Sequence, residues 1–147
     1  MSSAAVDQGA ERVKVLLDAA TQRFAGATTR LLRALRALPA ENVVSPAVLR
    51  AFAGYRSDLL AARERISALE TSDPAKQRAL AWLALVLEGV DEFERALTTH
   101  DPASAREHNS VTAARFAQAS TARLALDRGL GCPYGCEPSA VKEAGTK

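Results

Sequence analysis

Three short stretches, Ser45-Pro46-Ala47, Asp73-Pro74-Ala75 and Asp101-Pro102-Ala103, decide the fold of this 147-residue chain. In each stretch, the Ser or Asp side chain can accept a hydrogen bond from a free N–H of a first helical turn. Proline follows at the first helical position, where its missing N–H costs nothing. Helix starts are therefore predicted at 28-residue intervals. This interval fits helices of about 25 residues, roughly 38 Å long, joined by short reversals around Ser72 and His100.

The apolar residues before and between these starts repeat with alternating steps of three and four. This 3.5-residue repeat is typical of left-handed bundles, in which side chains interlock along a seam. The predicted seams are Val13, Leu17, Ala20, Phe24, Ala27, Leu31, Ala34 and Leu38; Val48, Phe52, Tyr55, Leu59, Ala62, Ile66 and Leu69; and Leu80, Leu83, Leu87, Val90, Phe93 and Leu97. Flanking apolar residues widen each stripe, which favours a bundle over a two-stranded coiled coil.

The fourth predicted helix is more polar than the other three. The residues expected to face the core there are Val111, Ala114, Phe116, Ala117, Leu124 and Ala125. Gly129-Leu130-Gly131 predicts where this helix ends. We therefore predict an all-α, up-and-down four-helix bundle with helices at about 8–38, 46–71, 74–99 and 102–128. The bundle domain would span residues 1–130, and residues 131–147 would form a flexible, irregular tail that contains both cysteines.

Composition and charge agree with this fold and exclude other classes. Alanine occupies 31 positions and aromatic residues make up 5% of the chain, a balance that favours helices over a β-sandwich or barrel. The formal net charge of +2 is far from the basic excess of most nucleic-acid-binding proteins. No stretch is long and apolar enough to predict a membrane span, and no targeting segment is visible. We expect a cytoplasmic protein by default, with a mature secreted chain as the alternative.

Cys132 and Cys136 are the chemically most distinctive pair, inside the stretch Cys132-Pro133-Tyr134-Gly135-Cys136. Proline and glycine let the chain turn back, so we predict a small disulfide loop worth about 2 kcal/mol. A metal site is a second interpretation, because cysteine and histidine are zinc ligands. His100 would lie too far along the fourth helix to join both cysteines in one chain, so the prediction includes no metal ligand. A thiol–redox couple is a third, disfavoured because a helix C-terminus opposes thiolate formation; reduced, exposed cysteines without a role are the fourth.

Arg12, Arg23 and Arg30 share one face of the first helix, whereas Arg33 and Arg36 would turn away from it. Arginine is enriched at protein interfaces, so these three residues are the predicted partner-binding residues. The fourth helix is too polar to cover the apolar stripes of the other three helices well. We therefore expect a partner to cover an apolar stripe next to this arginine-bearing face. A cluster of acidic residues, Glu88, Asp91, Glu92 and Glu94, could attract a cation or a basic partner, although an ordinary solvated helix face is the preferred interpretation.

These patterns predict a non-catalytic helical-bundle module for protein–protein interaction or scaffolding, with a protein partner or a homo-oligomer. We predict no enzyme activity, catalytic residue or cofactor, because no nucleophile–base or metalloenzyme motif stands at helical spacing. The alternative is a metal-binding or thiol-redox protein that uses Cys132 and Cys136. A small apolar ligand held between the helices near Tyr55 and Trp82 is a further possibility.

Overall fold

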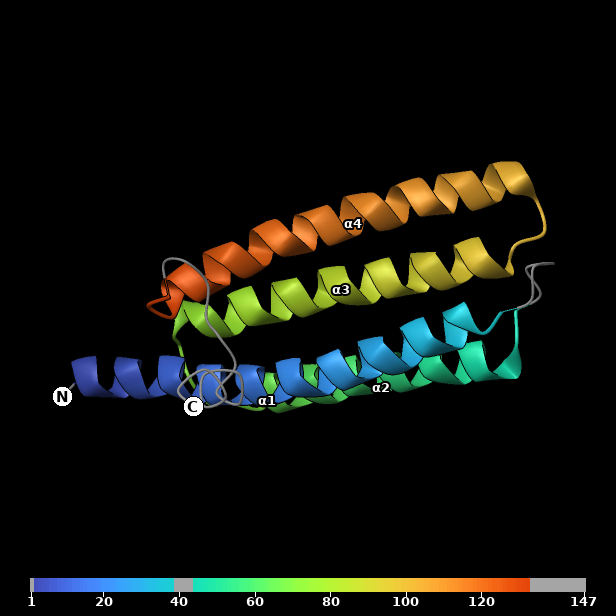
Figure 1. Ribbon diagram of the computed structural model, residues 1–147. Coiled ribbons are helices and arrows are strands. Elements are labelled where there is room, and N and C mark those ends of the chain that lie inside the picture. Colours follow the sequence, from blue (N-terminus) through green and yellow to red (C-terminus); the bar gives the residue numbers. More distant parts are fainter. Residues whose placement is uncertain (1, 39–43, 133–147) are drawn as a thin grey trace.

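The computed structural model describes residues 2–38 and 44–132 of the chain. Four helices make up this part: α1 (Ser2–Arg36), α2 (Pro46–Ser67), α3 (Pro74–Thr98) and α4 (Pro102–Gly129). They run alternately up and down and pack side by side (Figure 1). The predicted all-α four-helix bundle is therefore confirmed.

The three predicted helix starts are confirmed at the atomic level. Ser45 Oγ accepts a hydrogen bond from the Val48 N–H at 3.3 Å, and Asp73 Oδ1 accepts one from the Ala75 N–H at 2.9 Å. Asp101 Oδ2 accepts from both the N–H and the hydroxyl of Ser104, at 3.2 and 2.7 Å. These bonds satisfy N–H groups that have no partner within the helix, which fixes where each helix begins.

The helix ends differ from the prediction by several residues. Helix α1 already begins at Ser2, and α2 ends at Ser67 rather than at residue 71. Residues 68–73 form a connection in which the Asp73 N–H donates to Thr71 Oγ1 at 3.1 Å, so the chain leaves the helix before Thr71. Helix α4 stops as predicted, because Gly131 adopts the left-handed conformation at a φ of 87°, which glycine tolerates.

The predicted seams of α1, α2 and α3 form the core. Val13, Leu17, Val48, Phe52, Leu59, Ile66 and Leu83 are completely buried. The other predicted seam residues are also buried or lie partly buried against this core. The sequence repeat thus correctly identified the interior face of three helices.

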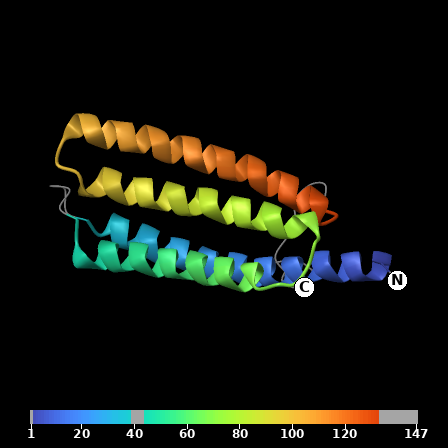
Figure 2. The same ribbon diagram turned by 180° about the vertical axis from the view of Figure 1, so that it is seen from behind.

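Helix α3 is the central element of the bundle. It packs against α1 and α2 on one side and against α4 on the other, whereas α1 and α2 pair with each other (Figures 1 and 2). Its buried residues accordingly fall on two faces: Ala79, Leu83 and Val90 share one, and Gly89 and Ala96 share the other. Helix α4 contacts α3 almost alone, so it needs only a narrow apolar stripe.

This arrangement corrects the predicted core face of α4. Ala114, Phe116, Ala117, Leu124 and Ala125 are exposed and Val111 is half-buried. The buried residues are instead Thr112, Ala119, Leu126 and Asp127. The first three are seven residues apart, the spacing of a single row of side chains along one neighbouring helix. Burying alanine contributes little apolar area, so the alanine-rich face of α4 was a poor indicator of its packing.

A row of aromatic contacts links all four helices through the middle of the bundle. Phe24 of α1 stacks on Tyr55 of α2 at 6.1 Å between ring centroids and contacts Trp82 of α3 at 6.0 Å. The guanidinium of Arg123 in α4 lies 4.6 Å from the centre of the Trp82 ring system, in a cation–π contact. Phe24 therefore contacts both Tyr55 and Trp82, the residues near which a bound small ligand stays a prediction.

None of the helices in the described ranges is sufficiently long and apolar to pass through a membrane.

Candidate functional site: the arginine face of α1 and α2

Arg12, Arg23 and Arg30 lie along the outer edge of the interface between α1 and α2, and all three are exposed. We call the line where these two helices meet at the surface the α1–α2 seam. Each directly precedes a buried seam residue, Val13, Phe24 or Leu31, which places it at the flank of the buried face of α1. Each lines a different depression along the seam. We name this surface the arginine face and define it by Arg12, Arg23, Arg30, Arg33, Arg50 and Arg65.

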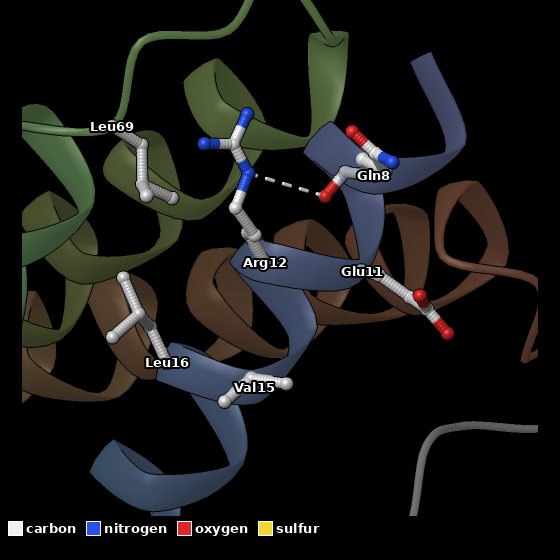
Figure 3. A pocket seen from close by; sticks show the side chains of 6 residues that line it. All are labelled: Gln8, Glu11, Arg12, Val15, Leu16 and Leu69. Carbon is white, nitrogen blue, oxygen red and sulfur yellow. Dashed lines mark hydrogen bonds between the residues drawn. The ribbon is translucent and has the colours of Figure 1, made fainter. Parts of the chain in front are cut away.

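The first depression is a groove of about 630 Å³ at the N-terminal end of α1, lined by Gln8, Glu11, Arg12, Val15, Leu16 and Leu69. Figure 3 shows Leu16 and Leu69 together on one side of Arg12, while Glu11 points away from it. Val15 is 67% exposed, the largest exposed fraction among the big apolar side chains of the described residues. This groove therefore combines an accessible apolar surface with a guanidinium group.

Arg12 is held in place by main-chain carbonyl groups rather than by a carboxylate. Its Nε donates to the Gln8 carbonyl oxygen at 3.4 Å, and its Nη2 donates to the Glu70 carbonyl oxygen at 3.3 Å. The second contact joins α1 to the connection after α2. These bonds orient the guanidinium across the groove but leave its charge without a counter-ion among the described residues.

The space along the α1–α2 seam is narrow in the middle and wider again near the C-terminal end of α1. Arg23 and Arg65 flank Asp58 over a crevice of only about 10 Å³. Beyond it, a depression of about 430 Å³ has three arginines and a floor of small residues, its lining being Arg30, Arg33, Ala34, Ala37, Ala47, Arg50, Ala51 and Gly54. Arg33, which was expected to turn away from the other arginines, therefore shares this depression with Arg30.

The charges of the arginine face are largely unpaired. Arg30 Nη2 lies 3.9 Å from Asp58 Oδ2, and 63% of the Arg30 side chain is exposed, so this pair contributes little. In the part of the chain that the structure describes, Arg23, Arg33, Arg50 and Arg65 form no ion pair. The molecule thus presents a positively charged strip that its formal net charge of +2 does not reveal.

The acidic cluster of α3 has the opposite character, because its carboxylates are paired within the chain. Arg56 of α2 donates to Asp91 Oδ1 at 2.8 Å and also to Glu94, and Arg115 of α4 lies 3.0 Å from Glu88 Oε2. Burial lowers the pKa of Arg56, but the hydrogen bonds to Asp91 and Glu94 outweigh it and leave that pKa raised. The cluster therefore holds α2 and α4 against α3, and its carboxylates already have cationic partners.

Glu92 bridges α3 and α4 by pairing with a histidine. Its Oε2 lies 2.7 Å from His108 Nδ1, and its Oε1 accepts a hydrogen bond from Arg95 at 2.7 Å. The bond to His108 is the main reason why the pKa of Glu92 is below its ordinary value. His108 thus has a structural role at the α3–α4 interface, and His100 is exposed.

Cys132 lies three residues after the end of α4, and its N–H donates to the Asp127 carbonyl oxygen at 2.8 Å. Cys136 lies outside the described residues. Within residues 2–38 and 44–132, no group of three or more His, Cys, Asp or Glu side chains is arranged to hold a metal ion. The predicted disulfide and its metal and redox alternatives therefore stay predictions.

The predicted partner-binding residues are thus brought onto one surface, and the apolar residues Val15, Leu16 and Leu69 lie in the same groove as Arg12. Three arginines of the face, Arg33, Arg50 and Arg65, were not predicted. Arg65 could have been, because it precedes the buried Ile66 as Arg12 precedes Val13.

Comparisons of this chain with protein-family models, with curated proteins and with solved structures gave no match.

Proposed function

We propose that this chain is a non-catalytic helical-bundle module that acts through protein–protein contacts at the arginine face of α1 and α2. The observation that carries the proposal is a row of arginines without carboxylate partners that lies beside an accessible apolar groove. Arg56, Arg95, Arg115 and Arg123 each pair with a carboxylate on α3 or α4. Five of the six arginines of the arginine face, all except Arg30, have no carboxylate partner among the described residues.

Unpaired arginines beside exposed apolar side chains are characteristic of binding surfaces. Arginine is enriched among the residues that dominate interface energies, since the guanidinium fork binds carboxylates in a bidentate manner, and neighbouring apolar groups gain from dehydration. Val15, Leu16 and Leu69 supply the apolar part next to Arg12. The rigid α1–α2 pair holds both parts in fixed positions, which lowers the entropic cost of binding.

A photo-crosslinking experiment tests this proposal. A benzophenone side chain replaces Val15 in the groove, and in a matched control it replaces Ser57, which is exposed on α2 outside the arginine face. We expect protein adducts from the Val15 position in the native cells and none above background from the Ser57 position. Adducts at neither position, or equal adducts at both, would contradict a protein-binding function for this face.

Native mass spectrometry over a range of concentrations separates the two kinds of partner. If the Val15 adduct has twice the mass of the chain, the partner is a second copy, and dimers should appear as the concentration rises. If the chain stays monomeric and the adduct has another mass, the partner is a different protein.

A further inference from the structure

The arginines of α1 are spaced in whole helical turns. Arg12 and Arg23 are 11 residues apart and Arg23 and Arg30 are 7 apart, which correspond to about three and two turns of an α-helix. The three residues therefore lie within about 20° of one another around the helix axis and span roughly 27 Å along it. A straight partner that runs parallel to the seam can meet all three.

The residues that line the α1–α2 seam favour a helical partner over a partner with a flat surface. Leu16 and Leu69 both line the groove at one end, and Ala47, Ala51 and Gly54 line the depression at the other. A Cβ atom placed on Gly54 would meet no atom within 4 Å, so the space above this turn of α2 is open. Small residues let a neighbouring helix approach closely, and an amphipathic helix in a groove is a common mode of peptide recognition.

On the basis of the proposed function, we propose that the arginine face binds an acidic amphipathic helix of another protein. This helix lies along the α1–α2 seam and places carboxylates, spaced by 11 and 7 residues, opposite Arg12, Arg23 and Arg30. Its apolar side chains enter the groove of Val15, Leu16 and Leu69. The identical spacing on both helices lets every guanidinium meet one carboxylate without bending either helix.

Charge complementarity argues against a second copy of this chain as the occupant. The acidic residues that cluster on α3 are Glu88, Asp91, Glu92 and Glu94. Each of them is paired with Arg56, Arg95, His108 or Arg115 within the chain. A second copy would have to break these pairs in order to reach the arginine face.

The apolar part of the surface argues against a nucleic acid. Val15 and Leu16 would gain nothing from a phosphate backbone, whereas they would be buried by the apolar side chains of an amphipathic helix. Lys14, which precedes Val15 in the sequence, already pairs with Asp18 at 2.8 Å. The basic strip is thus made of arginines beside apolar residues, as in protein interfaces.

Fluorescence anisotropy with designed peptides tests the inference. The probe is a labelled, alanine-based helix of about 22 residues that carries three glutamates in the 11- and 7-residue register, with leucines flanking the first glutamate. The control peptide has the same composition with its glutamates on the opposite helix face. We expect the probe to bind the full chain at least about tenfold more tightly than the control, and less tightly as salt concentration rises.

Matched variants locate the binding site. Arg23→Glu with Arg30→Glu should weaken binding of the probe by about tenfold or more, since two attractive pairs become repulsive. Arg63→Glu with Arg106→Glu changes the net charge equally, at exposed arginines outside the face, and should change the affinity less than about twofold. Circular dichroism checks that both variants remain helical.

The outcomes separate this inference from the proposed function. Equal binding of both peptides, or no binding of either, overturns the acidic-helix partner, while protein adducts at Val15 would still support a protein-binding module. Binding of single-stranded oligonucleotides that requires Arg23 and Arg30, without binding of the helical probe, would identify a nucleic acid and overturn the inference. Absence of both the probe complex and the Val15 adducts would contradict both proposals.

Discussion

The ring of Phe116 in α4 lies directly against the backbone of Gly89 in α3, where a Cβ atom would come within 2.7 Å of the ring. Gly89 is buried in the middle of its helix, whereas Phe116 is 36% exposed at the edge of the α3–α4 interface. The missing side chain of Gly89 therefore determines how closely α4 approaches α3.

Gly89→Ala should destabilise the protein, although alanine favours a helix interior over glycine by about 1 kcal/mol. The new methyl group has to displace the Phe116 ring, and such overpacking costs about 1–3 kcal/mol. In a Phe116→Ala background the obstacle is gone, and the same substitution should stabilise the protein. Urea unfolding of the four proteins of this double-mutant cycle measures the coupling; a Gly89→Ala effect that is the same in both backgrounds would contradict the contact.

Gly54→Ala is the matched control on α2. A Cβ atom at this position meets nothing within 4 Å, so only the helix preference changes. We expect a gain of about 1 kcal/mol in the free energy of unfolding. A loss of stability at Gly54 would mean that the space above this turn is filled in solution, for example by a second copy of the chain.

Arg56 should contribute measurably to the docking of α2 on α3. It bonds to both Asp91 and Glu94, and 29% of its side chain is exposed. Arg56→Met keeps the apolar stem and removes both ion pairs, so we expect a loss of about 1 kcal/mol in chemical unfolding. Arg50→Met, at an exposed arginine without an ion pair to the described residues, should change the stability by less than about 0.5 kcal/mol. Equal effects would show that the Arg56 pairs contribute nothing.

Glu92 should make stability depend on pH in the acidic range. Its pKa is lowered from an ordinary value of 4.5, chiefly by the hydrogen bond with His108. A carboxylate with a lowered pKa stabilises the fold above its unfolded-state pKa, and this contribution disappears as the pH falls through the folded-state pKa. Glu92→Gln should therefore be less stable than the parent near neutral pH, and the difference should shrink once the pH falls below about 4.5.

Glu107→Gln is the control for this titration. Glu107 is an exposed neighbour of His108 with no hydrogen bond to the described residues, so its replacement should change the stability at neutral pH by less than about 0.5 kcal/mol. A stability difference between the parent and Glu92→Gln that stays constant as the pH falls below about 4.5 would show that the carboxylate of Glu92 is not the titrating group.

The cysteine pair is tested by intact mass after alkylation of the denatured, non-reduced protein. A disulfide between Cys132 and Cys136 predicts no alkylation before reduction and two alkylated thiols afterwards. Because the loop is short, Cys132→Ser should then lower the free energy of unfolding by only about 2 kcal/mol. Two free thiols with a stoichiometric metal in native mass spectrometry would instead support the metal-binding alternative.

The sequence predicted most of the architecture because α1, α2 and α3 each bury an apolar stripe. The apolar repeat identifies buried positions such as Val13, Leu17 and Phe52. The helix starts follow from the restricted backbone of proline, which occupies the first helical position at Pro46, Pro74 and Pro102. The Arg12–Arg23–Arg30 row was likewise found from helical spacing, because it depends on α1 alone. Features that depend on one helix were therefore predictable.

Features that depend on two helices were not predictable in the same way. The burial of Thr112 and Ala119 in place of Phe116 and Leu124 follows from the close approach at Gly89, which no local pattern in α4 encodes. The depression between Arg30 and Arg50 likewise needs the relative positions of α1 and α2. The pairing of Arg56 with Glu94, 38 residues away, decides which charges remain for a partner.

Trp82, the only tryptophan of the chain, contacts both Phe24 of α1 and Arg123 of α4. The protein therefore carries a built-in spectroscopic reporter at the junction of α1, α3 and α4. Separation of α4 from α3 would remove Arg123 from the indole of Trp82 and expose that part of the indole to water. Separation of α1 would instead remove Phe24. The emission spectrum of a single residue, followed in the parent and in Arg123→Met, can thus reveal whether the last helix detaches before the other three unfold.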